Sequence, residues 1–254
     1  MIAHTNAYLR LRKQIEEMFD FTVTVCFAVP SLKEQIRVVK KGIAENLPEP
    51  DYFENNVPLE AVQKRAANYK LKLARYLLLS SFSFFEAYVK DGILEMVEFH
   101  GGSDQFIKTA ERRALTFVDT SDDNIHDIKR RLQEPEKPVK RLKYEKYSKQ
   151  LANTDYKFPS ELLSSYGVRL LISKVINLKS VEIPELLEHG LHLQIDANRF
   201  HQIRDARNKI AHGKTDEIKI SFQDAMEMNK DLRNFATTID NHLIDHFFVM
   251  EKYA

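Results

Sequence analysis

The sequence is poor in the residues that build disulfides, metal clusters and tight turns. Its one cysteine, Cys26, excludes an intrachain disulfide and any multi-cysteine zinc or iron–sulfur site. Only 7 of the 254 residues are glycine and 8 are proline. This scarcity of helix breakers, together with abundant Leu, Lys, Glu and Ala, favours helices over a turn-rich β fold.

Long apolar runs are also absent. The two longest, residues 19–29 and 76–85, are too short to span a bilayer. Residues 1–14 are polar and mixed in charge, unlike a signal peptide. With the single cysteine, these features predict a soluble protein in the cytoplasm. The net charge is +1, so any affinity for nucleic acid must come from local patches.

Helical periodicity is what the sequence has in abundance. Residues 59–99 form one long helical pattern, and Gly101-Gly102 is expected to end it. Its apolar stripe, at spacings of three and four, consists of Leu78, Phe82, Phe85, Val89, Ile93 and Met96. With 43% hydrophobic residues the chain can build a core, and we predict an all-α, up-and-down helical bundle.

Capping residues and breakers predict the other helices. Their ranges are 4–29, 31–46, 103–118, 122–133, 160–177, 184–190, 196–213 and 221–250. Residues 21–25 are rich in β-branched side chains and are also compatible with an extended segment. Ser31 with Glu34 forms a capping-box signature for the second helix. We predict one domain over 1–254, with residues 100–160 as a helical insertion.

The segment 204–213, Arg-Asp-Ala-Arg-Asn-Lys-Ile-Ala-His-Gly, carries the candidate chemistry. On a helix at about 100° per residue, the buried stripe is predicted to consist of Phe200, Ile203, Ala206 and Ile210. Arg207 falls inside that stripe. Arg204, Asn208 and His212 form a neighbouring polar row at spacings of four, and we predict a supporting role for Arg204.

An arginine beside a core is almost never left without a partner. Glu86, at the edge of the apolar stripe of the long helix, is the candidate. The simplest interpretation is a structural salt bridge. Our hypothesis is that Glu86 pairs with Arg207 and fixes its position.

Arg207-Asn208, followed by three residues and His212, resembles the Arg–polar–x–x–x–His motif of the HEPN superfamily. Residues 84–89, Phe-Phe-Glu-Ala-Tyr-Val, on an early long helix are similar to the RiboL-PSP-HEPN branch. The resemblance covers mainly the ranges 60–100 and 160–250, and it implies a HEPN-like helical bundle.

One position departs from a toxin branch of that family. Where that branch has a tyrosine two places after the histidine, this chain has Lys214. Regulation by modification of that tyrosine is therefore not expected, whereas the triplet of Arg207, Asn208 and His212 is intact.

The resemblance implies a metal-independent endoribonuclease with Arg207, Asn208 and His212 as catalytic residues and no cofactor. Histidine can take a proton from the ribose 2′-OH or give one to the leaving 5′-oxygen near neutral pH. Arginine can hold the phosphate and stabilise the pentavalent state, and asparagine can orient the histidine or the phosphate. The products would be a 2′,3′-cyclic phosphate and a 5′-hydroxyl.

The resemblance also implies a setting for this activity. The substrate would be RNA, with transfer RNA and messenger RNA as the candidates. The role would lie in toxin–antitoxin, stress or antiviral defence, with an antitoxin or defence-system protein as partner.

The spacing within the motif adds a constraint. Arg207 and His212 are five residues apart, roughly 140° around an ideal helix, so one regular helix does not point both at one phosphate. Either the helix frays at Ala211-His212 or two copies of the motif meet. HEPN proteins resemble the second case, so we predict a homodimer with a composite site. The alternative is a non-catalytic HEPN dimer that binds RNA or a protein partner.

A basic segment lies in the predicted insertion. Residues 129–149 hold nine basic and three acidic side chains, a net charge of +6, with Tyr144 and Tyr147 interleaved. This composition suits phosphate contacts and base stacking, and the alternative is a solvated linker. The predicted RNA-binding residues are Lys129, Arg130, Arg131, Lys140, Arg141, Lys143, Tyr144, Lys146 and, beside the motif, Lys214.

Two histidine pairs remain. His242 and His246 are four residues apart on the last predicted helix, and His189 and His192 flank Gly190. Neither pair has the carboxylate or cysteine companions of a zinc site, so we interpret them as surface histidines and expect no metal. A metal-dependent hydrolase using His242 and His246 is the third alternative.

Overall fold

The computed structural model describes residues 3–50, 57–113, 165–214 and 219–248. Among these residues there are helices and connecting turns but no strand, which confirms the all-α prediction. The helices are α1 (Asn6–Lys40), α2 (Leu59–Ala67), α3 (Tyr69–Phe99), α4 (Ser103–Arg113), α7 (Ser165–Val175), the 3₁₀ turn η3 (Ser180–Glu182), α8 (Ile183–Gly190), α9 (Ala197–Ala211) and α10 (Phe222–His246). None of the helices described is long and apolar enough to cross a membrane.

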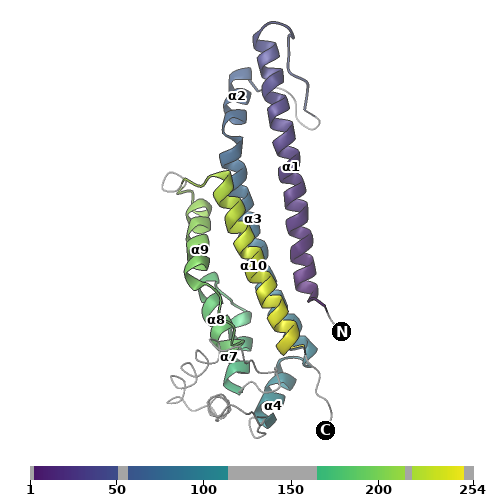
Figure 1. Cartoon of the computed structure of the whole chain (residues 1–254), viewed down its shortest axis with the longest axis vertical. Helices are drawn as coiled ribbons and strands as arrows, with labels where there is room; N and C mark the ends of the chain where they lie inside the picture. Colours follow the sequence, from purple (N-terminus) through teal and green to yellow (C-terminus); the bar gives the residue numbers. More distant parts are fainter. Residues whose placement is uncertain (1–2, 51–56, 114–164, 215–218, 249–254) are drawn as a thin grey trace.

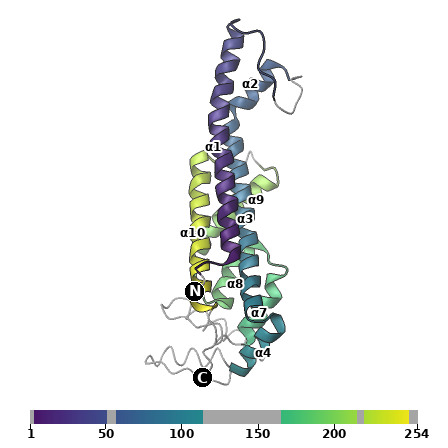
Figure 2. The ribbon, with the colours of Figure 1, turned by 90° about the vertical axis from the view of Figure 1, so that its right-hand side faces the viewer.

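Three long helices form the body of the molecule (Figures 1 and 2). α3 and α10 run toward the end that carries α4, and α1 runs the opposite way. α9 packs along α3, and α7 contacts both α4 and α8. The end of α1, with α2 and the first turns of α3, extends past the start of α10.

The core joins α3 to α9 and α10. All six residues of the predicted α3 stripe are at most 1% exposed. Phe200 of α9 lies with its ring centroid 5.7 Å from that of Phe82 and 6.0 Å from that of Phe85. Burying each of these rings stabilises the fold by about 1.5–3 kcal/mol. The predicted stripe on α9 is thus confirmed, and its packing fixes that helix against α3.

Two carboxylates hold the start of α1. Asp240 of α10 is fully buried and accepts hydrogen bonds from the Thr5 amide at 3.2 Å and the Thr5 hydroxyl at 2.6 Å. Glu95 of α3 accepts from the backbone amides of Asn6 at 2.8 Å and Ala7 at 2.9 Å. These bonds satisfy N–H groups that a helix start leaves open, and they tie α1 to both neighbours.

The predicted break near residue 30 is wrong, because α1 continues through Pro30 to Lys40. Ser31 is not an N-cap; its hydroxyl donates to the Phe27 carbonyl at 3.2 Å inside the helix. Proline removes its own N–H from the ladder, but the turns beyond it are held by packing, since Ile36 is 4% exposed. Tertiary contact therefore overrides the local breaker.

The possible extended segment at 21–25 is helical as well. The Thr22 and Thr24 hydroxyls donate to the carbonyls of Met18 and Asp20, four residues earlier. Such back-bonding is available to threonine within a helix, so β-branching alone does not exclude this conformation.

Residues 59–99 form two helices, not the one that was predicted. Asn68, with φ −98° and ψ 15°, separates α2 from α3. The break is invisible to periodicity because Ala66 and Leu73, on either side, both keep the buried spacing. The helix starts predicted at Asp196 and Ser221 are confirmed, since both side chains cap their helices. The end predicted at residue 46 is wrong, because α1 ends at Lys40.

Several predicted elements fall partly or wholly outside the described residues. α4 is described to Arg113 and α7 from Ser165. The predicted helix 122–133 lies outside, as does the start of the predicted helix 160–177. The single domain and its insertion at 100–160 remain predictions.

Gly190 ends α8 as predicted, but for a different physical reason. A Cβ there would lie 2.4 Å from Cδ2 and 2.9 Å from Cγ of Leu171. Leu171 is fully buried, so it has little room to move away. Gly190 is thus required for the close approach of α8 to α7.

We therefore expect Gly190→Ala to lower the free energy of unfolding by about 1–3 kcal/mol through overpacking. Urea denaturation would measure it. In a Leu171→Ala background the same substitution should cost clearly less, because the clashing atoms are gone. An equal cost in both backgrounds would contradict the proposed clash.

Candidate active site

Arg207 is held on three sides where α9 meets α3. Its Nη2 donates to Oε2 of Glu86 at 2.7 Å, and its Nη1 donates to Oδ1 of Asn208 at 2.9 Å. The guanidinium carbon lies 5.2 Å from the centroid of the Phe82 ring. The hypothesised pairing of Glu86 with Arg207 is confirmed as a contact.

This ion pair is partly shielded from water. The Arg207 and Glu86 side chains are 24% and 27% exposed, compared with 58% and 45% for the Arg10–Asp91 pair on the same bundle. Partial burial strengthens the attraction and makes an unpaired charge there costly. Arginine has five N–H donors, and since these two contacts use two of them, donors remain for a phosphate.

His212 closes α9. The Gly213 amide donates to the Ile210 carbonyl at 3.1 Å, and the Lys214 amide donates to the Lys209 carbonyl at 2.9 Å. With φ +72° at Gly213, this is a Schellman motif, in which glycine carries the left-handed residue at little cost. The helix is therefore regular from Arg207 to Ala211, and His212 is its C-cap.

The His212 side chain is exposed, and within the described part of the chain it makes no side-chain hydrogen bond. Five residues of regular helix separate it from Arg207, which turns the two positions roughly 140° apart. The structure thus joins Arg207, Asn208 and Glu86 by contacts, and it does not bring His212 into that cluster.

Arg204 belongs to the polar row but has a different partner. Its Nε and Nη2 donate to Oδ1 of Asp205 at 3.2 and 2.8 Å. Its third nitrogen, Nη1, is buried without a partner in the described structure. A supporting role for Arg204 toward Arg207 is not tested by these contacts and remains a prediction.

Two residues beside the motif were missed by sequence reasoning. His201 precedes Arg204 by three and extends the polar row, and its Nδ1 is also buried without a partner among the described residues. The same spacing rule would have found it. Phe82 was predicted only as core, and a sequence carries no signal that an arginine will lie over a particular ring.

Only one of the predicted RNA-binding residues, Lys214, belongs to the described part of the chain. Those between Lys129 and Lys146 lie outside the described residues. Lys214 is described and exposed, next to His212.

The histidine pairs are less exposed than predicted. His242 is buried, and its Nε2 lies 2.7 Å from the Leu191 carbonyl oxygen. His192 is 1% exposed with φ +54°. The surface interpretation is therefore wrong for His242 and His192, whereas His189 and His246 are partly exposed. His242 lies on the same buried stripe of α10 as Ile239. No group of three or more His, Cys, Asp or Glu side chains in the described ranges is placed to hold a metal ion.

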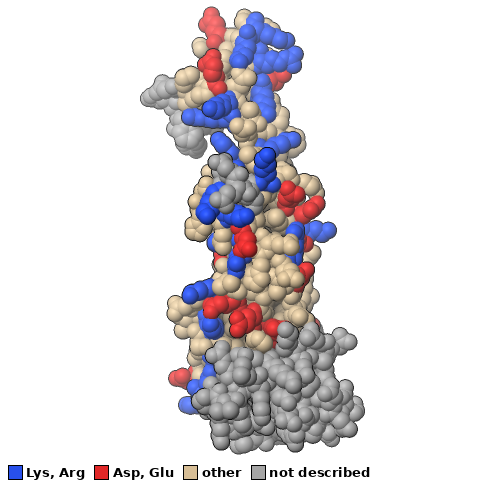
Figure 3. Space-filling view, turned by 90° about the vertical axis from the view of Figure 1, so that its left-hand side faces the viewer, with Lys and Arg blue, Asp and Glu red and all other residues tan. Residues whose placement is uncertain are grey.

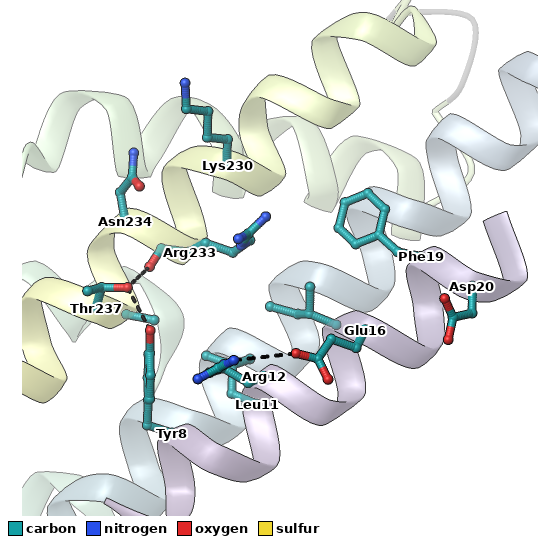
Figure 4. A pocket seen from close by; sticks show the side chains of 12 residues that line it. Tyr8, Leu11, Arg12, Glu16, Phe19, Asp20, Lys230, Arg233, Asn234 and Thr237 are labelled. Atoms are coloured by element: carbon teal, nitrogen blue, oxygen red, sulfur yellow. Dashed lines mark hydrogen bonds and ion pairs between the residues drawn. The ribbon is translucent and has the colours of Figure 1, made fainter. Parts of the chain in front are cut away.

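A groove of about 480 Å³ lies elsewhere, between α1 and α10 (Figure 4). Residues of both charge signs line it, among them Arg12, Glu16 and Lys230. No residue of α9 contributes, so the groove is separate from the candidate catalytic residues.

Comparison with known proteins gives one match. A family model described as RiboL-PSP-HEPN matches residues 51–245. No curated protein and no solved structure matches the chain.

The partial burial of the Glu86–Arg207 ion pair leads to a prediction about stability. Glu86→Ala would leave Arg207 partly buried without its carboxylate, so we expect a loss of about 1–3 kcal/mol in the free energy of unfolding. Asp91→Ala, on the same helix and in the exposed pair with Arg10, is the matched control and should cost less than about 1 kcal/mol. Equal costs in chemical denaturation would show that the Glu86 contact has no special weight.

Proposed function

The chain belongs to the RiboL-PSP-HEPN family, and from that premise we propose that it is a metal-independent endoribonuclease with Arg207, Asn208 and His212 as its catalytic residues. The family suggests a ribonuclease or an RNA-related function. The proposed products are a 2′,3′-cyclic phosphate and a 5′-hydroxyl. The proposed role is in toxin, stress or antiviral defence, in the cytoplasm.

One observation supports this proposal most strongly. Arg207 is fixed by Glu86 at 2.7 Å and lies over the Phe82 ring, yet its side chain keeps 24% exposure. A guanidinium held in place with free donors facing solvent is prepared to bind a phosphate without the usual ordering cost.

The proposed reaction uses each residue for one task. His212 takes the proton of the ribose 2′-OH, whose oxygen then attacks the adjacent phosphorus. Arg207 stabilises the additional negative charge on the phosphoryl oxygens. The 5′-oxygen leaves and takes up a proton, from a second histidine or from water. Asn208, whose Oδ1 already accepts from Arg207, keeps its amide N–H groups available for a phosphate oxygen.

The site is proposed to be shared between two chains. Arg207 and His212 lie roughly 140° apart on a helix that stays regular between them. A two-fold axis near α9 would place His212 of one chain opposite Arg207 of the other, because a two-fold interface uses the same surface on both chains.

The second candidate is a non-catalytic dimer that binds RNA or a protein. The observation in its favour is that Arg207 is already neutralised by Glu86 and that no described side chain orients His212 by a hydrogen bond. The two candidates differ in whether RNA is cut.

Incubation with total RNA in EDTA separates them. We expect cleavage by the wild-type chain, and a loss of at least about 100-fold in His212→Ala, since general acid–base catalysis contributes that much or more. Gln202→Ala, an exposed neutral position on α9, is the control and should cleave normally. RNA binding without cleavage, unchanged in His212→Ala, would support the binding module. Activity lost in EDTA would instead indicate a metal-dependent hydrolase.

Mixing two inactive variants tests the shared site. If Arg207 and His212 act across the interface, co-expressed Arg207→Ala and His212→Ala chains form heterodimers with one intact site of two. With random pairing, about one quarter of the wild-type activity should return. A site within one chain would leave the mixture as inactive as each variant alone.

A further inference from the structure

The end of the molecule beyond α10 carries an unusual charge pattern. From residue 61 to residue 85, between Glu60 and Glu86, the sequence has no acidic side chain and five basic ones. These are Lys64, Arg65, Lys70, Lys72 and Arg75, which we call the basic arm. The whole chain has a net charge of only +1, so this concentration is local.

The basic arm is a fixed part of the fold. Ile36, Ala66 and Leu73 are each at most 6% exposed, so α1, α2 and α3 share a small core there. Across it, the Lys40 ammonium donates to the Gln63 side chain, and the Lys33 ammonium lies 5.1 Å from the centroid of the Tyr69 ring. A charged surface on such a support keeps its position relative to α9.

Four of its five side chains face solvent. Lys64, Arg65, Lys70 and Lys72 are exposed. Figure 3 shows Lys and Arg outweighing Asp and Glu over the upper part of the face that carries α9. Such a surface attracts a polyanion, because each phosphate neutralised by a lysine or arginine releases a condensed counterion.

An aromatic side chain accompanies the charge. Tyr76 is 67% exposed and lies one helical turn beyond Lys72. A ring beside cations is the combination that binds unpaired bases and their phosphates. This favours single-stranded RNA over a protein or a lipid surface.

The basic arm also leads toward the candidate catalytic residues. Lys72, Arg75 and Glu86 fall within about 60° of one face of α3. Arg75 and Glu86 are 11 residues apart, or about 16 Å along the helix axis, and Glu86 contacts Arg207 at 2.7 Å. A strand lying on the basic arm can therefore continue along α3 to Arg207.

We propose that the basic arm binds single-stranded RNA and directs it along α3 to Arg207, Asn208 and His212. This inference rests on the proposed function in taking RNA as the ligand. It differs in assigning the binding surface to residues of α2 and α3 that belong neither to the motif nor to the segment 129–149.

The test measures binding of a fluorescent single-stranded RNA oligonucleotide by anisotropy over a range of salt concentrations. The full chain carries His212→Ala so that the RNA stays intact. Lys64→Gln with Lys72→Gln should raise Kd about tenfold or more. It should also reduce the slope of log K against log salt by about 1.4, or about 0.7 for each phosphate that is no longer neutralised.

Lys13→Gln with Lys90→Gln removes the same charge from exposed positions on the lower bundle and is the matched control. It should change Kd less than about twofold and leave most of the slope. Tyr76→Ala should raise Kd at least about fivefold while leaving the slope unchanged, because stacking carries no charge.

Equal effects of the arm and control variants would overturn the inference. So would lysine-dependent sedimentation with phosphatidylserine vesicles in the absence of RNA binding, which would make the ligand a membrane. If binding depends on the arm but the wild-type chain cuts no RNA, the inference stands and the proposed catalysis fails. If RNA is cut and the arm variants bind and cut normally, the reverse holds.

Discussion

The charge of Arg207 is the constraint on which this structure depends. A guanidinium inserted among the apolar residues of α9 must be paired, and Glu86 of α3 supplies the partner at 2.7 Å. The pair lies beside Phe82, Phe85 and Phe200, whose packing holds α9 against α3. The same contact that satisfies the charge therefore sets the register of the two helices. It also holds the guanidinium in one orientation.

The end of α9 is the reason why we propose a site shared between two chains. Gly213 closes the helix through a Schellman motif directly after His212, so the motif residues keep regular helical spacing. A regular helix separates Arg207 from His212 by roughly 140°. The backbone does not bend to bring the two residues together, because the hydrogen bonds that end α9 keep its last turn helical. The proposed second chain would supply His212 to the Arg207 of its partner and so remove this conflict.

The helices and the ion pair could be predicted from the sequence because each follows from the type and spacing of residues within one helix. The stripe from Leu78 to Met96 is periodic, and Arg207 breaks the periodicity of α9, so a partner had to exist. Predictions failed where tertiary packing opposed a local signal. Pro30 and the Ser31–Glu34 pair suggested a helix start, but α1 continues past them because residues such as Ile36 are buried against the neighbouring helices.

Other features had no signal in the sequence at all. The lone Asn68 separates two helices without disturbing the apolar spacing. His242 was predicted at the surface but is buried. Its partner, the Leu191 carbonyl, lies in a distant segment, so nothing in the sequence indicated the hydrogen bond. The packing of Phe82 under Arg207 and of Gly190 against Leu171 likewise depends on which surfaces meet, which residue spacing does not encode.

We propose above all that Arg207 and His212 cut RNA by using the ribose 2′-OH as the nucleophile. The most direct measurement follows cleavage, in EDTA, of an oligoribonucleotide and of the same oligonucleotide with one 2′-deoxyribose at the main cleavage position. We expect that position to resist cleavage, and the products of the unmodified strand to end in a cyclic phosphate and a 5′-hydroxyl. Equal cleavage of the deoxy-substituted strand, or products with a 5′-phosphate, would contradict the claim.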